Sequence, residues 1–440
     1  MSEFPDKVAI VGGGPAGLAM GRALDVFGVD YEILEQMEDF GGLWNRDWEQ
    51  SPIYDSAHFI SSRTMSAFAD YPMPDDWPDY PRHDQILAYT RSFARAFDLY
   101  EKTRFNAAVT SATPGDGGWT VQTSDGNTAR YRWLVCANGA TWDAKVPAFD
   151  GQFNGVLRHS GTYKSAAEFD GKRVLVVGGG NSGADITCDA AQRADHAGIS
   201  LRRGYWFIPK HFNGLPTDVF AESQPKVPLW IRQIVLKRKL RKLIGDLTRL
   251  GLPEPDHELL ETHPLMNDQM LHYLRHGDIT VYPDIDHLDG DEVVFKGGQR
   301  GQFDEIILAT GYNWSVPFLP VGTLPKGRFK LPLCMFAPDR EDLFFISFIK
   351  AAGSSITLFG DMAWIIARAI AAADTPEHGK LRSEIARNDF DLTKGLKMVG
   401  SDRHDAYVNR EAFAAALLKL RKRMGWPPVE RPTPPKDDAA

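Results

Sequence analysis

The stretch VAIVGGGPAG, residues 8–17, decides the fold of this chain. Its first four residues are a short β-branched run, which predicts a buried parallel strand. A cluster of glycines in the pattern GxGxxG follows, and residues 18–27 are predicted to form a helix. A second short strand over residues 31–34 completes the pattern. The sequence therefore begins with a strand–helix–strand unit.

Each part of this glycine motif has a physical task in binding a dinucleotide. The glycines allow a tight turn, close approach of a pyrophosphate and close packing of helix on strand. The helix N-terminus offers free N–H groups to the phosphates. Glu35, at the end of the second strand, can accept both ribose hydroxyls, and its charge disfavours a 2′-phosphate, so FAD or NAD is expected. The predicted contacts are Gly12, Gly14, Pro15, Ala16, Gly17, Glu35 and Gln36.

The same pattern recurs once in the middle of the chain. The run RVLVV, residues 173–177, is followed by a second GxGxxG, a helix over residues 184–193 and a strand around residues 199–201. That strand ends in Arg202 and Arg203, whose guanidinium groups can pair with a 2′-phosphate. NADPH is therefore favoured over NADH, although the alternative that these arginines only solvate a surface turn stays open. The second motif itself contributes Gly178, Gly180, Asn181, Ser182 and Gly183.

Residues 35–44, EQMEDFGGLW, distinguish FAD from NAD at the first motif. They resemble the segment after the ribose-binding acid in flavin-containing monooxygenases, the single-component class B flavoprotein monooxygenases, where it reads roughly ExxxxxGGxW. The resemblance implies that FAD occupies the first motif and that Gly42, Leu43 and Trp44 lie beside it. The alternative for Trp44 is a plain core aromatic residue.

Residues 153–163, FNGVLRHSGTY, match the identifying sequence of that family, FxGxxxHxxx(Y/F), through Phe153, Gly155, His159 and Tyr163. Baeyer–Villiger monooxygenases resemble it but usually have Trp in place of this Tyr. The segment resembles a hinge between domains, so we expect the His to be structural. Further landmarks lie in the family's order at residues 203–210, 263–268 and 308–312, so the resemblance covers about residues 7 to 365 and adds Val109, Thr310 and Gly311 to the predicted cofactor contacts.

The resemblance implies a reaction. NADPH would reduce FAD by hydride transfer, and the reduced flavin would capture O₂ as a C4a-(hydro)peroxyflavin. Its protonated form suits amines and sulfides, and its deprotonated form suits ketones; the protein positions and shields the flavin. The chain is therefore expected to be an FAD- and NADPH-dependent monooxygenase whose partners are O₂ and a small molecule. No catalytic residue is assigned.

The chain departs from the family within residues 56–64, SAHFISSRT. The active-site Asn of the family aligns with Ile60, which cannot donate a hydrogen bond to NADP⁺ or the flavin. His58, Ser61 and Ser62 are the candidates that could replace it. Two alternatives therefore stay open: an NADPH oxidase or flavin reductase that releases peroxide, and a non-catalytic NADPH-sensing flavoprotein.

The domain organisation follows from the two glycine motifs. We expect an α/β fold with two Rossmann-like dinucleotide-binding domains, the NADPH domain inserted into the FAD domain. The FAD domain is predicted to comprise residues 1–155 and 300–440, including a returning strand at residues 305–309, and the NADPH domain to comprise residues 156–299. The proline-rich end, residues 427–440, is predicted to be disordered.

Composition limits the remaining functions. A net charge of −8 argues against nucleic acid as a partner. Cys136, Cys188 and Cys334 form no close pair and no metal-ligand spacing, which argues against a disulfide reductase or a metal site and is typical of a reducing cytoplasm. No signal peptide or transmembrane run is recognised, so a soluble protein is expected. Residues 226–251 predict a basic amphipathic helix that either caps the NADPH domain or weakly contacts an acidic surface. The sequence is compatible with a homodimer but does not determine the oligomeric state.

Overall fold

The computed structural model describes residues 4–224, 227–323, 331–397, 399 and 407–428. Its chain divides into two compact units, each assembled from separated stretches, so the expected insertion of one domain into the other is confirmed. Unit 1 comprises Met1–Trp48, Arg63–Ala140 and Trp314–Ala440, and unit 2 comprises Glu49–Ser62 and Thr141–Asn313.

Unit 1 is built on a five-stranded sheet in which every neighbouring pair of strands runs parallel. Numbered along the chain, the strands lie side by side in the order 3-2-1-4-5. Doubly wound dinucleotide-binding sheets share this order. In space the strands are β3 (Thr103–Arg104), β2 (Tyr31–Leu34), β1 (Val8–Val11), β7 (Trp133–Cys136) and β21 (Leu343–Phe345).

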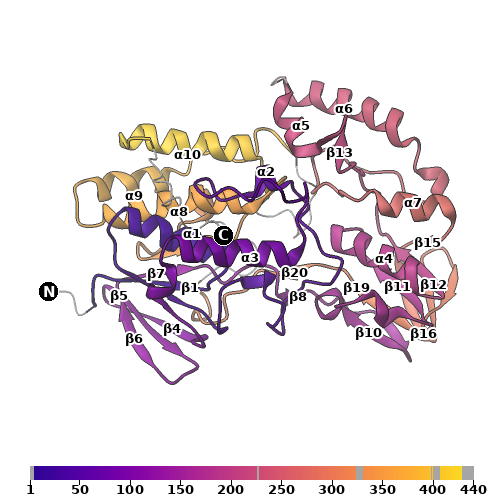
Figure 1. Ribbon diagram of the computed structural model, residues 1–440, viewed down its shortest axis with the longest axis horizontal. Helices are drawn as coiled ribbons and strands as arrows, with labels where there is room; N and C mark the ends of the chain where they lie inside the picture. Colours follow the sequence, from indigo (N-terminus) through magenta and orange to yellow (C-terminus); the bar gives the residue numbers. More distant parts are fainter. Residues whose placement is uncertain (1–3, 225–226, 324–330, 398, 400–406, 429–440) are drawn as a thin grey trace. The chain divides into compact units, whose positions relative to one another are not determined.

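The run VAIV forms β1 at the centre of this sheet, where all four residues are buried. Valine and isoleucine suit a strand that is covered on both faces. The chain then turns through the glycines into α1 (Pro15–Val26), which packs beside α8 (Ser355–Ala371) from far along the sequence (Figure 1). The remaining elements of unit 1 are η1 (Gly42–Trp44), α2 (Arg63–Ser66), α3 (His83–Ala96), η2 (Leu99–Lys102), β4 (Val109–Gly115), β5 (Gly118–Thr123), β6 (Thr128–Tyr131), η6 (Pro332–Cys334), β22 (Lys350–Ala351), α9 (Glu377–Arg387), β23 (Tyr407–Val408) and α10 (Arg410–Met424).

Unit 2 repeats the plan with a second parallel sheet of five strands. Its first four strands again follow the order 3-2-1-4, and a strand that precedes the glycine motif takes the fifth place. In space they are β15 (Ile279–Tyr282), β12 (His196–Ser200), β11 (Arg173–Val177), β19 (Glu305–Leu308) and β10 (Val156–His159).

The helix after the second glycine motif is α4 (Asn181–Arg193), which lies against β11 and β12 (Figure 1). A smaller four-stranded sheet, β18-β17-β16-β9, completes the core of the unit. The remaining elements of unit 2 are β8 (Asp143–Ala144), β9 (Asp150–Phe153), η3 (Ser160–Thr162), η4 (Ala166–Phe169), β13 (His211–Phe212), β14 (Leu215–Pro216), α5 (Thr217–Ser223), α6 (Leu229–Ile244), η5 (Thr248–Leu250), α7 (Gln269–His276), β16 (Ile285–Gly290), β17 (Glu292–Phe295), β18 (Arg300–Gln302) and β20 (Tyr312–Asn313).

The predicted return of residues 305–309 to the first domain is wrong. These residues form β19, which lies between β10 and β11 in the sheet of unit 2. The chain leaves unit 2 only after β20 has paired with β8, so the predicted boundaries at 155 and 300 move to 140 and 314. The segment Glu49–Ser62 also belongs to unit 2, which the sequence did not indicate.

The predicted basic helix is α6, which is shorter than residues 226–251 because it begins after Pro228 and ends at Gly245, where φ is +82°. Leu240 packs into a small cluster of buried side chains, whereas Trp230, near the start of the helix, is 63% exposed. Contact with an acidic surface therefore stays a prediction. Residues 429–440 of the predicted disordered tail lie outside the described residues.

Candidate functional site

The first glycine motif is a cradle in which side chains have no room. Gly12 has a φ of +110°, and a Cβ there would lie 2.7 Å from the carbonyl oxygen of Ala137. A Cβ on Gly17 would lie 1.9 Å from the carbonyl oxygen of Gly12. The first turn of α1 starts at Gly14 without a side-chain cap. Its N–H groups therefore remain available to an anionic ligand, as a pyrophosphate requires.

Glu35 lies directly beside this cradle and is buried. Its Oε2 accepts the backbone N–H of Gly13 at 2.5 Å, and its Oε1 accepts that of Met37 at 2.9 Å. Burial raises the pKa of the Glu35 carboxyl, while these backbone hydrogen bonds act in the opposite direction. The backbone N–H of Gln36 also interacts with this carboxylate, and because a carboxylate has about four acceptor positions, at least one remains for a ribose hydroxyl. Gln36, the next predicted contact, is exposed.

The turn at residues 41–44 packs onto the same cradle. Gly41 and Gly42 both have positive φ, +148° and +54°. A Cβ on Gly42 would lie 2.8 Å from the Cα of Gly14, so the two backbones are in contact. The structure thus brings together two stretches that the sequence predicted separately, with Leu43 and Trp44 partly buried in the turn. Val109, the remaining predicted contact in this unit, is partly buried at the start of β4.

Asn138 is a residue of this site that sequence reasoning missed. It follows β7, and its Nδ2 donates to the carbonyl of Ser315 at 2.9 Å. Its Oδ1 is buried and accepts no hydrogen bond from the residues that the structure describes. A buried acceptor without a donor is costly, and a ligand bound at the adjacent Gly12 cradle could supply the donor. The signal was available, because WLVC followed by ANG resembles EIIL followed by ATG at residues 305–311.

The second glycine motif repeats this geometry in unit 2. Gly178 has a φ of +114°, and a Cβ there would lie 2.6 Å from the carbonyl oxygen of Ala309. A Cβ on Gly183 would lie 2.0 Å from the carbonyl oxygen of Gly178. Helix α4 starts at Gly180, again without a side-chain cap. The two cradles therefore present the same features to a phosphate, each in its own unit.

Thr310 and Gly311 lie beside this second cradle. The sequence prediction implied that they lie in the unit of the first cradle, and this is wrong. The reason is the placement of β19, whose end carries them past Gly178. Thr310 Oγ1 donates to the carbonyl of Lys145 at 2.5 Å, which ties the turn to the residue that follows β8. Both residues therefore belong to unit 2.

The two predicted phosphate-binding arginines lie just after β12, separated from the strand by Leu201. Arg202 is exposed, and Arg203 is partly buried with a buried Nε that lacks a hydrogen-bond partner within the described part of the chain. A guanidinium N–H without an acceptor suits an incoming phosphate oxygen. The side chain of Asn181 is committed elsewhere, since its Oδ1 accepts the backbone N–H of Met266 at 2.9 Å. Ser182, beside it, is hydrogen-bonded to Tyr54.

The fingerprint segment lies inside unit 2, and not in a hinge between the units. Its strands β9 and β10 pair with β16 and β19 of the same unit. His159 Nδ1 accepts the N–H of Gly161 at 3.1 Å, so its Nε2 carries the proton and donates to the carbonyl of Gly311 at 2.9 Å. Burial lowers the pKa of His159, which keeps the ring neutral. A Cβ on Gly155 would lie 2.4 Å from the carbonyl oxygen of Asp304, and Phe153 is partly buried at the end of β9.

Residues 49–62 carry the candidates for the missing Asn. His58 is exposed, with its Nδ1 2.8 Å from the carbonyl oxygen of Ser56. Ile60 is 38% exposed, Ser61 is buried, and Ser62 is fully buried with an Oγ that has no partner among the described residues. The backbone N–H of Ser62 donates to Asp218 Oδ2 at 2.7 Å. The candidates therefore have different surroundings. Ser62 has a buried hydroxyl that no other described residue uses in a hydrogen bond.

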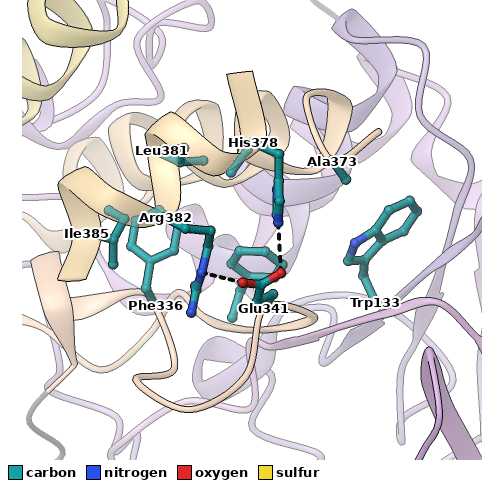
Figure 2. Close-up of a pocket in the computed structure, with 10 residues that line it drawn as sticks. Trp133, Phe336, Glu341, Ala373, His378, Leu381, Arg382 and Ile385 are labelled. Atoms are coloured by element: carbon teal, nitrogen blue, oxygen red, sulfur yellow. Dashed lines mark hydrogen bonds and ion pairs between the residues drawn. The ribbon is translucent and has the colours of Figure 1, made fainter. Parts of the chain in front are cut away.

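A pocket in unit 1 contains none of the predicted site residues. Figure 2 shows Glu341 between His378 and Arg382, at 2.8 and 3.0 Å. The His378 hydrogen bond is the main cause of the lowered pKa of the Glu341 carboxyl. Both basic side chains that line the pocket are thus paired with Glu341, and the other lining residues are apolar. These apolar lining residues are Trp133, Phe336, Phe344, Ala369, Ala373, Leu381 and Ile385.

Neither a metal site nor a membrane span is found in the part of the chain that the structure describes. No three His, Cys, Asp or Glu side chains are grouped so as to hold a metal ion. No helix there combines the length and the apolar character needed to cross a membrane.

Comparison with known proteins places these features in a family. The model of the family described as flavin-binding monooxygenase-like matches residues 5–410. Human flavin-containing monooxygenase 5 is 30% identical over 94% of this chain and 83% of its own. The probable indole-3-pyruvate monooxygenase YUCCA9 of Arabidopsis thaliana is 33% identical over 70% of this chain and 75% of its own.

Solved structures share the fold at lower identity. Tmm from Pelagibacter sp. strain HTCC7211 aligns with a TM-score of 0.69 and 19% identity, over 97% of this chain and 88% of that one. Cyclohexanone monooxygenase from Rhodococcus sp. Phi1 bound to NADP⁺ aligns with a TM-score of 0.69 and 17% identity, over 96% and 97%. With two matching cradles in two Rossmann-like units and a family match over nearly its whole length, the chain belongs to the flavin-binding monooxygenase-like family, a family of flavin-dependent oxidoreductases that use FAD and NADPH.

Proposed function

We propose that this flavin-dependent monooxygenase holds FAD on the Gly12 cradle of unit 1 and NADPH on the Gly178 cradle of unit 2. The observation that carries the proposal is the duplication itself, because each unit has an uncapped helix N-terminus above a glycine cradle. Two dinucleotides in one chain suit an enzyme that passes a hydride from one to the other. When bound, FAD supplies the redox chemistry, accepting the hydride and reacting with O₂.

The residues of each unit have distinct tasks in this proposal. In unit 1, Glu35 orients the ribose of FAD, and the turn at Gly42 encloses the pyrophosphate. In unit 2, Arg202 and Arg203 bind the 2′-phosphate that distinguishes NADPH from NADH. His159 stays neutral and donates a hydrogen bond to the Gly311 carbonyl. Its task is therefore to hold this turn in place and not to transfer a proton.

We propose that the substrate is a small soft nucleophile, an amine or a sulfide, with a ketone as the second class. Tyr163 supports the first class, because Baeyer–Villiger enzymes usually have Trp at this position of the fingerprint. The names of similar proteins cover N-oxide formation, an S-oxygenase and a ketone monooxygenase. The test incubates the holoenzyme with NADPH and ¹⁸O₂ and with dimethylaniline, a dialkyl sulfide or cyclohexanone. We expect one ¹⁸O atom in the product of the amine or of the sulfide. If only the lactone formed from cyclohexanone carried the label, the proposed preference for amines and sulfides would be contradicted.

One observation favours a second function, an NADPH oxidase that releases peroxide. Ile60 presents no polar group where the family has Asn, so a hydrogen bond to the bound cofactors is missing there. Such an enzyme would consume NADPH and O₂ without a labelled product in any of the three incubations.

Replacing Ile60 with Asn is expected to lower the peroxide released per NADPH consumed by about threefold to tenfold. A restored hydrogen bond is worth roughly 0.5–1.5 kcal/mol, which corresponds to that range. Peroxide and NADPH are measured together in the presence of an amine substrate.

Two serine variants separate this account from its alternative. If a neighbouring serine already has the polar role, Ser61→Ala or Ser62→Ala will raise peroxide release while Ile60→Asn only disturbs packing. The buried Oγ of Ser62, which has no hydrogen-bond partner among the residues described, makes Ser62→Ala the more informative of the two. An unchanged ratio in all three variants would show that the active site does not lie on this segment.

A further inference from the structure

Helix α4 carries two carboxylates one turn apart, Asp185 and Asp189, on the face that packs into unit 2. Residues four apart on a helix share a face. Asp189 Oδ2 accepts Ser56 Oγ at 2.6 Å and the Tyr163 hydroxyl at 2.8 Å. Asp185 accepts the Tyr54 hydroxyl at 2.9 Å through Oδ2. Burial raises the pKa of both carboxyls, so these hydrogen bonds replace the water that each carboxylate has lost.

The donors come from separate parts of the sequence. Tyr54 and Ser56 belong to residues 49–62, whereas Tyr163 is the last residue of the fingerprint. Asn267, from the landmark at residues 263–268, donates to Asp185 Oδ1 at 2.6 Å. The helix therefore gathers three segments that lie far apart in the sequence on two carboxylates.

Backbone contacts strengthen the attachment of residues 49–62. The N–H of Asp55 donates to the carbonyl of Lys164 at 2.9 Å, and Lys164 Nζ donates to the carbonyl of Ser51 at 2.5 Å. At the far end, Ser62 is held by Asp218 of α5. The stretch between these anchors contains Ile60. The position of Ile60 therefore depends on α4, through Ser56, at one end of the stretch and on α5, through Ser62, at the other.

The N-terminus of α4 is the second glycine cradle, and Asp189 lies two turns further along the same helix. A helix transmits a displacement of its N-terminus to its side chains as a rigid element. We propose that Asp189, assisted by Asp185, is a positioning residue that couples NADP(H) binding at this cradle to the placement of residues 54–62. The inference rests on the proposed NADP(H) site. It also assigns a task to the fingerprint tyrosine, whose hydroxyl joins the fingerprint to Asp189.

The test is hydrogen–deuterium exchange of peptides covering residues 54–62 in the FAD-loaded protein, with and without NADP⁺. In the unchanged protein, NADP⁺ is expected to slow exchange there by about threefold to tenfold, the scale of one or two hydrogen bonds. Asp189→Ala should abolish this difference. Asp189→Asn should restore most of it, because the amide oxygen still accepts hydroxyl donors. A purely structural role would instead speed exchange equally with and without NADP⁺.

Two further variants keep the test decisive. Tyr163→Phe removes only a hydroxyl, so it should fold and reduce the NADP⁺-dependent difference at least about twofold. Asp170→Ala is the matched control, because this exposed carboxylate pairs with Arg193 at the other end of α4, at 2.8 Å. We expect Asp170→Ala to exchange like the unchanged protein.

NADP⁺ affinity, measured first by titration calorimetry, distinguishes the two levels of the proposal. If NADP⁺ does not bind the unchanged protein, the proposed function fails at the second cradle and the inference fails with it. If NADP⁺ binds but residues 54–62 show no protection, or show the same protection in Asp189→Ala and Tyr163→Phe, the coupling alone is overturned. The proposal is supported if NADP⁺ slows exchange at residues 54–62 in the unchanged protein, if this effect is absent in Asp189→Ala, and if most of it is present in Asp189→Asn.

Discussion

Gly14→Val is expected to yield a protein that purifies without FAD and is colourless. A Cβ at this position would lie 3.3 Å from the Cα of Gly42, so the two further carbons of valine enter the space between the motif and the turn. That is the space through which a pyrophosphate must approach the backbone. We expect at least a tenfold loss of flavin per protein chain, on the order of 1.4 kcal/mol or more in binding free energy. The measurement is the flavin absorbance of the purified protein.

The backbone at Gly14 has a φ of −80°, which any residue can adopt, so the substitution acts on space and not on conformation. Gly379→Ala is the matched control in the same unit. A Cβ there, on α9, would meet nothing within 4 Å. The control should remain yellow, with a melting temperature that is unchanged or slightly higher, because alanine suits a helix better than glycine. A yellow, FAD-saturated Gly14→Val protein would remove the first motif from the cofactor site.

Replacing Arg202 and Arg203 with Ala should raise the KM for NADPH by about tenfold to hundredfold and that for NADH by less than about threefold. Hydrogen bonds to charged groups are worth roughly 1.5–3 kcal/mol, and only NADPH carries the 2′-phosphate. Removing Arg203 also deletes its buried Nε, for which the described ranges of the chain supply no acceptor. Initial rates of NADPH and NADH oxidation at varied coenzyme concentration measure both constants.

Arg238→Ala serves as the control for a general loss of positive charge from unit 2. This arginine is exposed on α6 and carries the same charge. It should leave the ratio of the two KM values unchanged. Equal losses with both coenzymes in the Arg202 and Arg203 variant would mean that these arginines support the fold or bind elsewhere.

The sequence predicted the parts of the fold that local patterns encode. The strands at residues 8–11, 31–34 and 173–177 have the predicted bounds, because short buried β-branched runs have few alternatives. Both motif helices begin a few residues earlier than expected, at Pro15 and Asn181, since the last glycine of each motif is already helical.

What the sequence could not reveal depends on contacts between distant residues. A four-residue apolar run such as EIIL indicates burial but not which sheet it joins, and β19 was therefore assigned to the wrong unit. The hydrogen bond from Ser56 to Asp189 joins residues 133 positions apart, and no local pattern indicates it. The two aspartates one turn apart on a predicted helix were the only signal, and most such pairs face solvent.

The chain passes between the two units four times, after residues 48, 62, 140 and 313. Synthesis on the ribosome therefore completes the units in the reverse of the order in which they begin. The central strand β1 is made first, yet its sheet lacks an edge until β21 emerges at residues 343–345. The sheet of unit 2 has all its strands once residue 308 has emerged. Unit 2 can thus fold before unit 1 is complete, and a gene fragment that ends before residue 343 would leave unit 1 with an open, aggregation-prone sheet.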